Sequence, residues 1–222
     1  MQTPDYQKAA TRALETLVRF GVDSAPINPI PMILSMPDAV TLVTYSQLSD
    51  DTGVNRMDLI RKAAYAPDAF SSANLIDGKR HYIIAYNKKL GENNHSLHCA
   101  LARELGHVIL GHDGSLPYDV RMEEVRCFHH HLLAPRPLIH MIQASGIRLT
   151  TATLNFITGC NDQCLSSMRT IPAVETPSDL NRAVRDQFNE YFFNHFEVQR
   201  VRTANDGTAL ADFGTYMEGY KE

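Results

Sequence analysis

Residues 97–112 read LHCALARELGHVILGH, and this stretch decides how the rest of the chain is interpreted. Its apolar residues recur at intervals of three and four, as on one side of a helix: Leu97, Leu101, Leu105 and Val108. Arg103 and His107 stand one turn apart on another side, with Glu104 between the two sides. Such a helix suits the floor of a cleft, and a surface helix with an ordinary charged face is the alternative.

The same stretch contains most of the zinc-peptidase motif H-E-x-x-H. In that motif two histidines one turn apart bind the metal, and the glutamate beside the first activates water. Glu104 and His107 have the right spacing, but Arg103 occupies the place of the first histidine. A guanidinium keeps its proton at any usable pH and therefore offers zinc no lone pair. At about 4 Å and an effective dielectric of 20, it would also repel a divalent ion by about 8 kcal/mol.

The composition is that of an ordinary globular protein. The 222 residues are 44% hydrophobic and 21% charged, and the formal net charge of −4 gives no broad electrostatic reason to bind nucleic acid. No apolar stretch approaches the roughly 20 residues that span a bilayer. Residues 1–5 (MQTPD) lack the basic stretch and apolar run of a signal peptide. We therefore expect a cytoplasmic protein that does not contact membranes.

Cysteines and histidines elsewhere give weak metal signals. The cysteines are sparse and form no C-x-x-C pair, so we expect reduced thiols: Cys99, Cys127, Cys160 and Cys164. The run His129-His130-His131 invites a metal interpretation. However, adjacent helical residues point about 100° apart, so one ion cannot take all three. We expect two of these histidines to be solvated and one to pack.

Periodicity and turn residues predict the other elements of the first 135 residues. Asp77-Gly78 favours a tight turn, so the apolar runs on either side of it predict a β-hairpin over 72–76 and 81–86. The remaining predictions are helices over 5–20, 32–36 and 121–133, a strand over 39–45, and a turn or short helix over 52–64. The second long helix carries its own core stripe: Val125, Phe128 and Leu132.

The region after Pro137 is predicted to be helical. Three short helices are expected over 138–144, 151–158 and 162–171, and an aromatic-rich helix over 179–198. Two short helices joined by a glycine turn are similar to a helix-turn-helix, but the second offers only Arg169 as a base. The aromatic helix is expected to dock on the body or on another copy of the chain, which would make a homo-oligomer.

Four segments together resemble the ImmA/IrrE family of metallopeptidases: residues 102–107 (ARELGH), 110–112 (LGH), 123–128 (EEVRCF) and 132–135 (LLAP). That family carries A-H-E-L-G-H, then L-G-H, then a glutamate helix E-A-N-x-F-A and an L-L-M-P ending. The resemblance covers about residues 1–135, and the helices that follow look similar to those after the peptidase domain in relatives. Val125 and Arg126 depart from the second motif.

The resemblance implies a fold, a zinc site and a class of partner. The fold is α+β, with a small mixed sheet packed on the active helix and the glutamate helix, followed by an all-helical C-terminal region. His107 and Glu124 would bind zinc, and Glu104 would be the general base. Members of the family cut repressor proteins of mobile elements or stress regulons. The implied divisions are a peptidase domain (1–135), a helical subdomain (136–172) and a C-terminal helix with its tail (173–222).

Two hypotheses address the missing ligand. In the first, the Arg103 guanidinium takes the place of the metal and bridges Glu124 and Glu104 through charge-assisted hydrogen bonds. In the second, a neighbouring side chain substitutes as the third zinc ligand; the candidates are His98, Cys127 and His131.

Three functions follow. The first is a zinc endopeptidase of impaired or lost activity that acts on a repressor-like regulator. The second is a pseudo-peptidase that binds and regulates such a partner without cleaving it. The third, a DNA-binding regulator using residues 148–171, has little support from the acidic charge balance.

Overall fold

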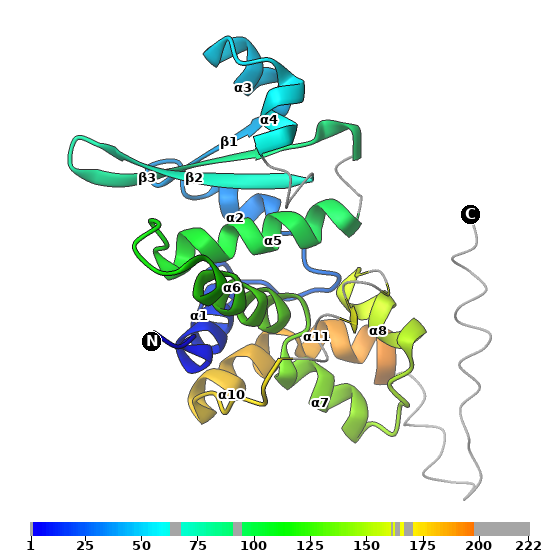
Figure 1. Cartoon of the computed structure of the whole chain (residues 1–222). Helices are drawn as coiled ribbons and strands as arrows, with labels where there is room; N and C mark the ends of the chain where they lie inside the picture. Colours follow the sequence, from blue (N-terminus) through cyan, green and yellow to red (C-terminus); the bar gives the residue numbers. More distant parts are fainter. Residues whose placement is uncertain are drawn as a thin grey trace, which may run out of the picture.

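The computed structural model describes residues 2–62, 68–90, 95–160, 162, 165–166 and 171–197. A small sheet lies over one face of helix α5, and the helices α6 and α1 lie on the opposite face of α5 (Figure 1). The C-terminal helices α7, α8, α10 and α11 follow below them. The predicted α+β class, with a helical C-terminal region, is confirmed.

The sheet contains β1 (Val40–Thr44), β2 (Ala69–Ile76) and β3 (Lys79–Tyr86) in the order β1-β3-β2. β1 runs parallel to β3 and β2 runs antiparallel to it, so the sheet is mixed. Asp77 and Gly78 join β2 to β3 with positive φ angles of 51° and 73°. Two positive φ angles in a two-residue loop match the twist of a hairpin, and glycine adopts them without a steric penalty. The predicted hairpin is confirmed, and β2 lies at one edge of the sheet.

The helices agree with the predictions in most places. Their bounds are α1 (Tyr6–Arg19), α2 (Ile30–Leu34), α3 (Tyr45–Thr52), α4 (Arg56–Lys62), the 3-10 turn η1 (Lys88–Leu90), α5 (His95–Leu110), α6 (Tyr118–Leu133), α7 (Arg136–Ala144), α8 (Thr151–Thr158), α10 (Ser178–Gln187), α11 (Asn189–Phe192) and the π-helical turn η2 (Phe193–Glu197). The helix predicted over 162–171 falls largely outside the described residues.

One helix was missed and one predicted helix was wrong. The turn or short helix expected over 52–64 is confirmed as α4, but α3, which begins at Tyr45 directly after β1, was not predicted. The cause is a capping box in which Thr44 accepts from the Gln47 amide while Gln47 reaches back to Thr44. The single helix expected over 179–198 is divided at Phe188 into α10 and α11.

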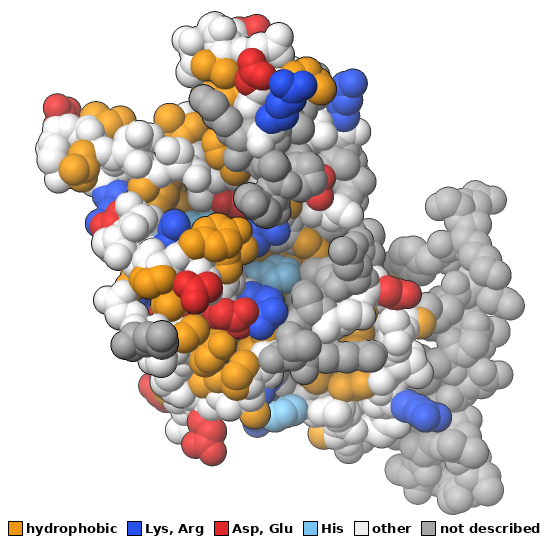
Figure 2. Space-filling model, viewed as in Figure 1, with side chains coloured by type: hydrophobic (Ala, Val, Ile, Leu, Met, Phe, Trp, Pro, Cys, Tyr) orange, Lys and Arg blue, Asp and Glu red, His pale blue; other side chains and the backbone are white. Residues whose placement is uncertain are grey.

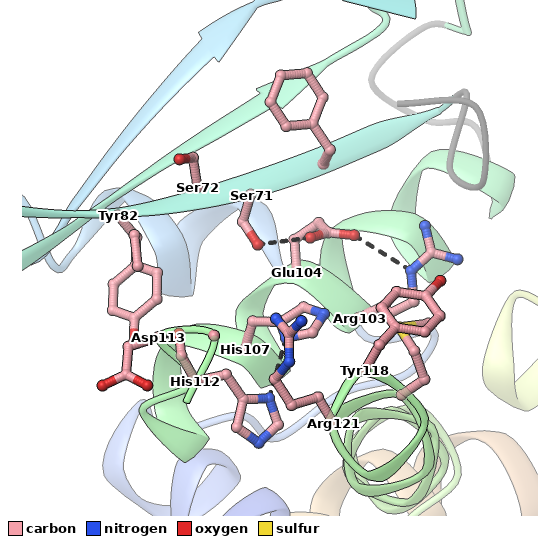
Figure 3. A pocket seen from close by; sticks show the side chains of 14 residues that line it. Ser71, Ser72, Tyr82, Arg103, Glu104, His107, His112, Asp113, Tyr118 and Arg121 are labelled. Atoms are coloured by element: carbon pink, nitrogen blue, oxygen red, sulfur yellow. Dashed lines mark hydrogen bonds and ion pairs between the residues drawn. The ribbon is translucent and has the colours of Figure 1, made fainter. Parts of the chain in front are cut away.

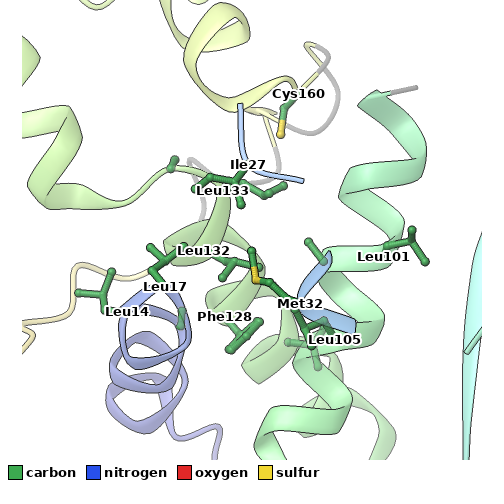
Figure 4. Packing of buried hydrophobic residues seen from close by; sticks show 14 of the residues in the cluster. Leu14, Leu17, Ile27, Met32, Leu101, Leu105, Phe128, Leu132, Leu133 and Cys160 are labelled. Atoms are coloured by element: carbon green, nitrogen blue, oxygen red, sulfur yellow. The ribbon is translucent and has the colours of Figure 1, made fainter. Parts of the chain in front are cut away.

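The core is built around α5. Leu97, Leu101 and Leu105 are fully buried, as the apolar stripe predicted. The predicted stripe of α6 is also fully buried and faces them: Val125, Phe128 and Leu132. Leu14 and Leu17 of α1 join the same cluster (Figure 4). α5 is therefore held between the sheet and the α1–α6 pair, and its remaining side is available to line a cleft.

The C-terminal aromatic residues pack on the body of the chain. Phe188, Tyr191 and Phe192 are buried in the main apolar cluster, and α10 and α11 both contact α7. Phe193 remains 48% exposed. In the part of the chain that the structure describes, no helix combines the length and the apolar character needed to span a bilayer.

α6 packs tightly against α5 at Gly106. A Cβ atom at this position would lie 3.0 Å from Cδ1 of Phe128. Phe128 is fully buried between the helices, so its ring has little room to move. The glycine of the E-L-G-H segment thus permits the contact between the two helices that carry the motif residues.

We expect Gly106→Ala to lower the free energy of unfolding by about 1–3 kcal/mol, because overpacking outweighs the better helix propensity of alanine. Urea unfolding measures the change. The loss should be smaller in a Phe128→Leu background, where the offending ring is absent. A neutral or stabilising Gly106→Ala would contradict this packing.

Candidate functional site

A cleft of about 400 Å³ lies between β2, α5 and α6 (Figure 3). Its lining includes Ser71, Ser72 and Ala73 from β2, Arg103, Glu104 and His107 from α5, and Tyr118, Arg121 and Met122 from α6. His112, Asp113 and Gly114 of the α5–α6 loop close one end. On the face shown in Figure 2, basic, acidic and histidine side chains gather between the sheet and the lower helices. The position predicted for a cleft floor on α5 is therefore correct.

Glu104, the residue expected to be the general base, is buried at the back of this cleft. It is only 4% exposed, and it accepts hydrogen bonds from Ser71 Oγ at 2.7 Å and from Arg103 Nε at 3.2 Å. Burial raises the pKa of Glu104, against the opposing effect of Arg103 and Ser71. Burial, followed by the charge of Glu104, raises the pKa of nearby Tyr45 to about 12. The carboxylate is held by its neighbours and does not stand free to accept a proton from water.

The two residues expected to bind zinc are linked through a third side chain, His112. His107 Nδ1 lies 3.0 Å from His112 Nδ1, and His112 Nε2 lies 2.9 Å from Glu124 Oε2. The other oxygen of Glu124 accepts the backbone N–H of Asp5 at 2.9 Å. His112 and Glu124 are 5% and 4% exposed, so the chain of hydrogen bonds is shielded from water.

Protons can be assigned along this chain from the hydrogen bonds. Burial lowers the pKa of His107 to about 3, and burial also lowers the pKa of His112, although Glu124 opposes this. Both rings are therefore neutral at pH 7. A neutral His112 donates from Nε2 to the Glu124 carboxylate, and its Nδ1 accepts from Nδ1–H of His107. With these protons, each hydrogen bond between His107, His112 and Glu124 joins one donor to one acceptor.

The end of α5 brings His112 into this position. Gly111 has a φ of 74°, the His112 N–H donates to His107 O at 2.9 Å, and the Gly111 N–H donates to Val108 O at 3.1 Å. This pair of bonds is the Schellman pattern at a helix C-terminus, and it turns the chain back over the last turn. His112 was not among the site residues predicted from sequence. The L-G-H triplet after the motif was the signal that could have identified it.

The hypothesis that Arg103 bridges both glutamates is half right. The Arg103 guanidinium bonds Glu104, but in the described structure the partners of Glu124 are His112 and Asp5. Arg103 is adjacent to Glu104 in the chain and can reach it directly. Glu124 lies on α6, and there its carboxylate is hydrogen-bonded to His112. The imidazole of His112, and not the guanidinium, therefore joins the predicted zinc ligands.

The three substitute ligands do not complete a zinc site with His107 and Glu124. Cys127 Sγ contacts the backbone oxygen of Tyr6 at 3.4 Å, and His131 Nδ1 donates to the backbone oxygen of Cys127 at 2.9 Å. Among the described residues, neither these two nor His98 comes within metal-binding reach of His107 and Glu124 together. The ring of His112 presents one nitrogen to each of the two, which keeps them from meeting on one ion. These residues do not fit the zinc site that the resemblance implies.

A second group of metal-ligating side chains lies outside the cleft. Ligand atoms of Cys99, His129 and Cys160 are all within 4.8 Å of one another, so this group could hold a metal ion. His129 and His131 are 7% and 1% exposed, and the expectation that two histidines of the run are solvated was wrong. They are buried because α6 is packed against both α1 and α5.

The thiols also differ in their surroundings. Cys99, Cys127 and Cys160 form no disulfide, and Cys164 lies outside the described residues. Burial raises the pKa of the Cys127 thiol to about 12, so this thiol is protonated at pH 7. Cys127 is therefore a packed core residue, whereas Cys99 and Cys160 belong to a group of ligands.

Comparison of the chain with protein-family models, with curated proteins and with solved structures gave no match. The function of the cleft must therefore be argued from its residues and their geometry.

The pH dependence of stability tests the environment of Glu104. Its pKa is raised in the folded chain, so the native state binds this proton more tightly than the unfolded state does. Stability from this group is present at low pH and is lost as the pH rises from the ordinary carboxyl pKa through the raised one. We expect Glu104→Gln to unfold at a higher temperature than the parent at pH 7, with a difference that shrinks towards pH 4.

Calorimetry at several pH values measures this difference. Glu15→Gln is a suitable control, because Glu15 is a partly exposed carboxylate that pairs with Arg12 on α1. Its substitution should change the unfolding temperature little at any pH. A stability difference for Glu104→Gln that does not vary with pH would contradict the raised pKa.

Proposed function

We propose that this chain binds an extended segment of a partner protein in the cleft without hydrolysing it. The observation that carries the proposal is the position of the His112 ring between His107 and Glu124. Arg103 adds to it by standing in a ligand position and bonding Glu104. Zinc hydrolysis needs a metal with an open coordination position and a base free to activate water. The hydrogen bonds of His112 engage His107 and Glu124, and those of Glu104 engage the proposed base, so this arrangement supports neither requirement.

The shape of the cleft supports an extended partner. Among the described strands β2 pairs only with β3, so the edge of β2 next to α5 is available for a further strand. Ser71, Ser72 and Ala73 of this strand line the cleft opposite α5. A peptide can add to a sheet edge through backbone hydrogen bonds, while pockets beside the edge select its side chains. The cleft floor would supply those pockets.

The charges of the cleft support an acidic residue in the partner. Glu104 is paired with Arg103, and Asp113 is paired with Arg80 at the far end. Arg121 uses its Nε to donate to the Leu116 backbone oxygen, and its terminal nitrogens extend towards the cleft (Figure 3). A guanidinium with free donors suits a carboxylate held by two parallel hydrogen bonds. We therefore propose that an acidic side chain of the partner meets Arg121.

The resemblance guides the choice of partner class. Repressor-like regulator proteins are the substrates of the family that the motifs resemble, so a regulator of this kind, met in the cytoplasm, is the partner that we propose. Binding would affect the regulator by holding one of its segments in the cleft. Direct contact with nucleic acid is not part of this proposal.

A residual zinc endopeptidase is the second candidate. Glu104 and His107 line the same cleft, and Glu124 is joined to His107 through His112, which favours it. It would require the His112 ring to leave its two hydrogen bonds and a third ligand to arrive. The geometry therefore favours binding without cleavage.

Zinc analysis separates the two candidates. We expect the parent and Glu124→Gln to contain the same amount of zinc after purification, because no zinc of the parent depends on the cleft. Arg103→His should gain up to one further equivalent, because it removes the repelling charge and supplies the missing ligand, and zinc can then displace the His112 ring from Glu124. This gain should disappear in the double variant with Glu124→Gln. Loss of one equivalent of zinc from the parent on Glu124→Gln would contradict the proposal.

Selection from a random peptide library tests the binding itself. We expect peptides that bind the parent to share an acidic residue, to remain uncut, and to bind Arg121→Ala at least about tenfold more weakly, as loss of a charged hydrogen bond would produce. Arg12→Ala on the exposed face of α1 is the matched control and should bind normally. Cleavage of the selected peptides by the parent, or equal binding by Arg121→Ala, would argue against the proposal.

A further inference from the structure

Three ligand side chains from separate parts of the chain converge away from the cleft. Cys99 lies on α5, His129 lies on α6, and Cys160 follows the end of α8. Their ligand atoms all lie within 4.8 Å of one another, and the two sulfur atoms are 3.1 Å apart. Such convergence from positions about 30 residues apart arises only through the packing of the three helical segments.

We propose that Cys99, His129 and Cys160 bind one soft divalent cation, with zinc as the expected ion. The donor set decides the class of metal, because thiolate and imidazole ligands suit zinc, whereas calcium and magnesium take oxygen ligands. Binding would release the two thiol protons, and the resulting pair of thiolates would neutralise the charge of the ion. Water or a fourth donor completes the tetrahedron. This inference does not depend on the proposed function of the cleft.

The distances suit an ion after a small adjustment. A disulfide would need the sulfur atoms about 2.05 Å apart, well below the observed 3.1 Å. In a tetrahedral zinc site with bonds of about 2.3 Å, the two sulfurs stand about 3.8 Å apart. A shift of less than one ångström therefore opens the pair to the required width. Rotation of the partly exposed Cys99 side chain is sufficient for this.

The surroundings combine a rigid site with a route for the ion. His129 and Cys160 are 7% and 3% exposed, and Cys160 belongs to the buried apolar cluster (Figure 4). The Cys160 N–H donates to Thr158 Oγ1 at 3.0 Å, and Gly159 turns the chain with a φ of 63°. These contacts hold Cys160 just beyond the end of α8. Cys99 is only partly buried, so an ion would reach the group from its side.

The position of the ion indicates a structural role. It would tie the segment after α8 to both long helices of the core, α5 and α6. Metal that binds only the folded chain adds its binding free energy to stability. The ion would therefore fix the helical C-terminal region on the body that carries the cleft.

Cobalt titration of the reduced, metal-free full chain tests the site. The parent should bind one equivalent of Co²⁺ and develop thiolate-to-cobalt charge-transfer absorption, together with the visible bands of a tetrahedral ion. Cys99→Ser, Cys160→Ser and His129→Gln should each weaken binding by at least about a hundredfold, more than loss of an outer contact does. Cys127→Ser is the matched control, because Cys127 is an equally buried thiol that contacts Tyr6 instead.

A second measurement follows the stability of the parent chain and needs no substitution of a proposed ligand. Zinc should raise the unfolding temperature of the reduced parent, and Glu124→Gln should retain the same rise, since the cleft is not involved. A parent that shows no thiolate-to-cobalt absorption overturns the proposal. So does absorption that survives all three ligand substitutions, or a rise with zinc that is lost on Glu124→Gln.

Discussion

The buried hydrogen bond between His112 and Glu124 is the interaction on which the site depends. It joins the end of α5 to the middle of α6, and the same carboxylate holds the backbone of Asp5 at the start of α1. An unpaired carboxylate at this depth would cost several kcal/mol, so each partner is needed by the other. The pair therefore links three helices and, at the same time, engages the carboxylate that the resemblance implied as a zinc ligand.

The ionisable residues in and beside the cleft are hydrogen-bonded to one another. Glu104 is held by Ser71 and Arg103, and His107 is held by His112. His107 and His112 are neutral, and the carboxylates of Glu104 and Glu124 have hydrogen-bond partners. No charge in this group therefore requires an ion to balance it. Among the described residues, the group that could hold a metal ion is Cys99, His129 and Cys160, and its thiol and imidazole donors are of the kind that zinc prefers. The proposed cleft and the proposed structural ion use different residues, so one fold can contain both.

Much of the fold could be predicted because local patterns decide it. The stripes of Leu97, Leu101 and Leu105 and of Phe128 and Leu132 located the two central helices, and Asp77-Gly78 located the hairpin. The start of α3 was missed because a capping box at Thr44 ended the strand early. The spacing of apolar residues carries no information about such a side-chain hydrogen bond.

The site was harder to predict than the fold. The spacing of Glu104 and His107 and the presence of Glu124 predicted correctly that a cleft would form over α5. The L-G-H triplet could have pointed to His112, but its position depends on the left-handed conformation of Gly111, which returns the ring over the helix end. The grouping of Cys99, His129 and Cys160 arises from tertiary packing of distant segments, so no spacing rule could reveal it.

The most direct test of this account is the location of zinc in crystals of the reduced protein grown with the metal. Anomalous scattering at the zinc edge identifies the ion and its ligands together. The account predicts a peak about 2.3 Å from the sulfur atoms of Cys99 and Cys160, beside His129, and none between His107 and Glu124. A peak bonded to both His107 and Glu124, with the His112 ring displaced, would contradict it.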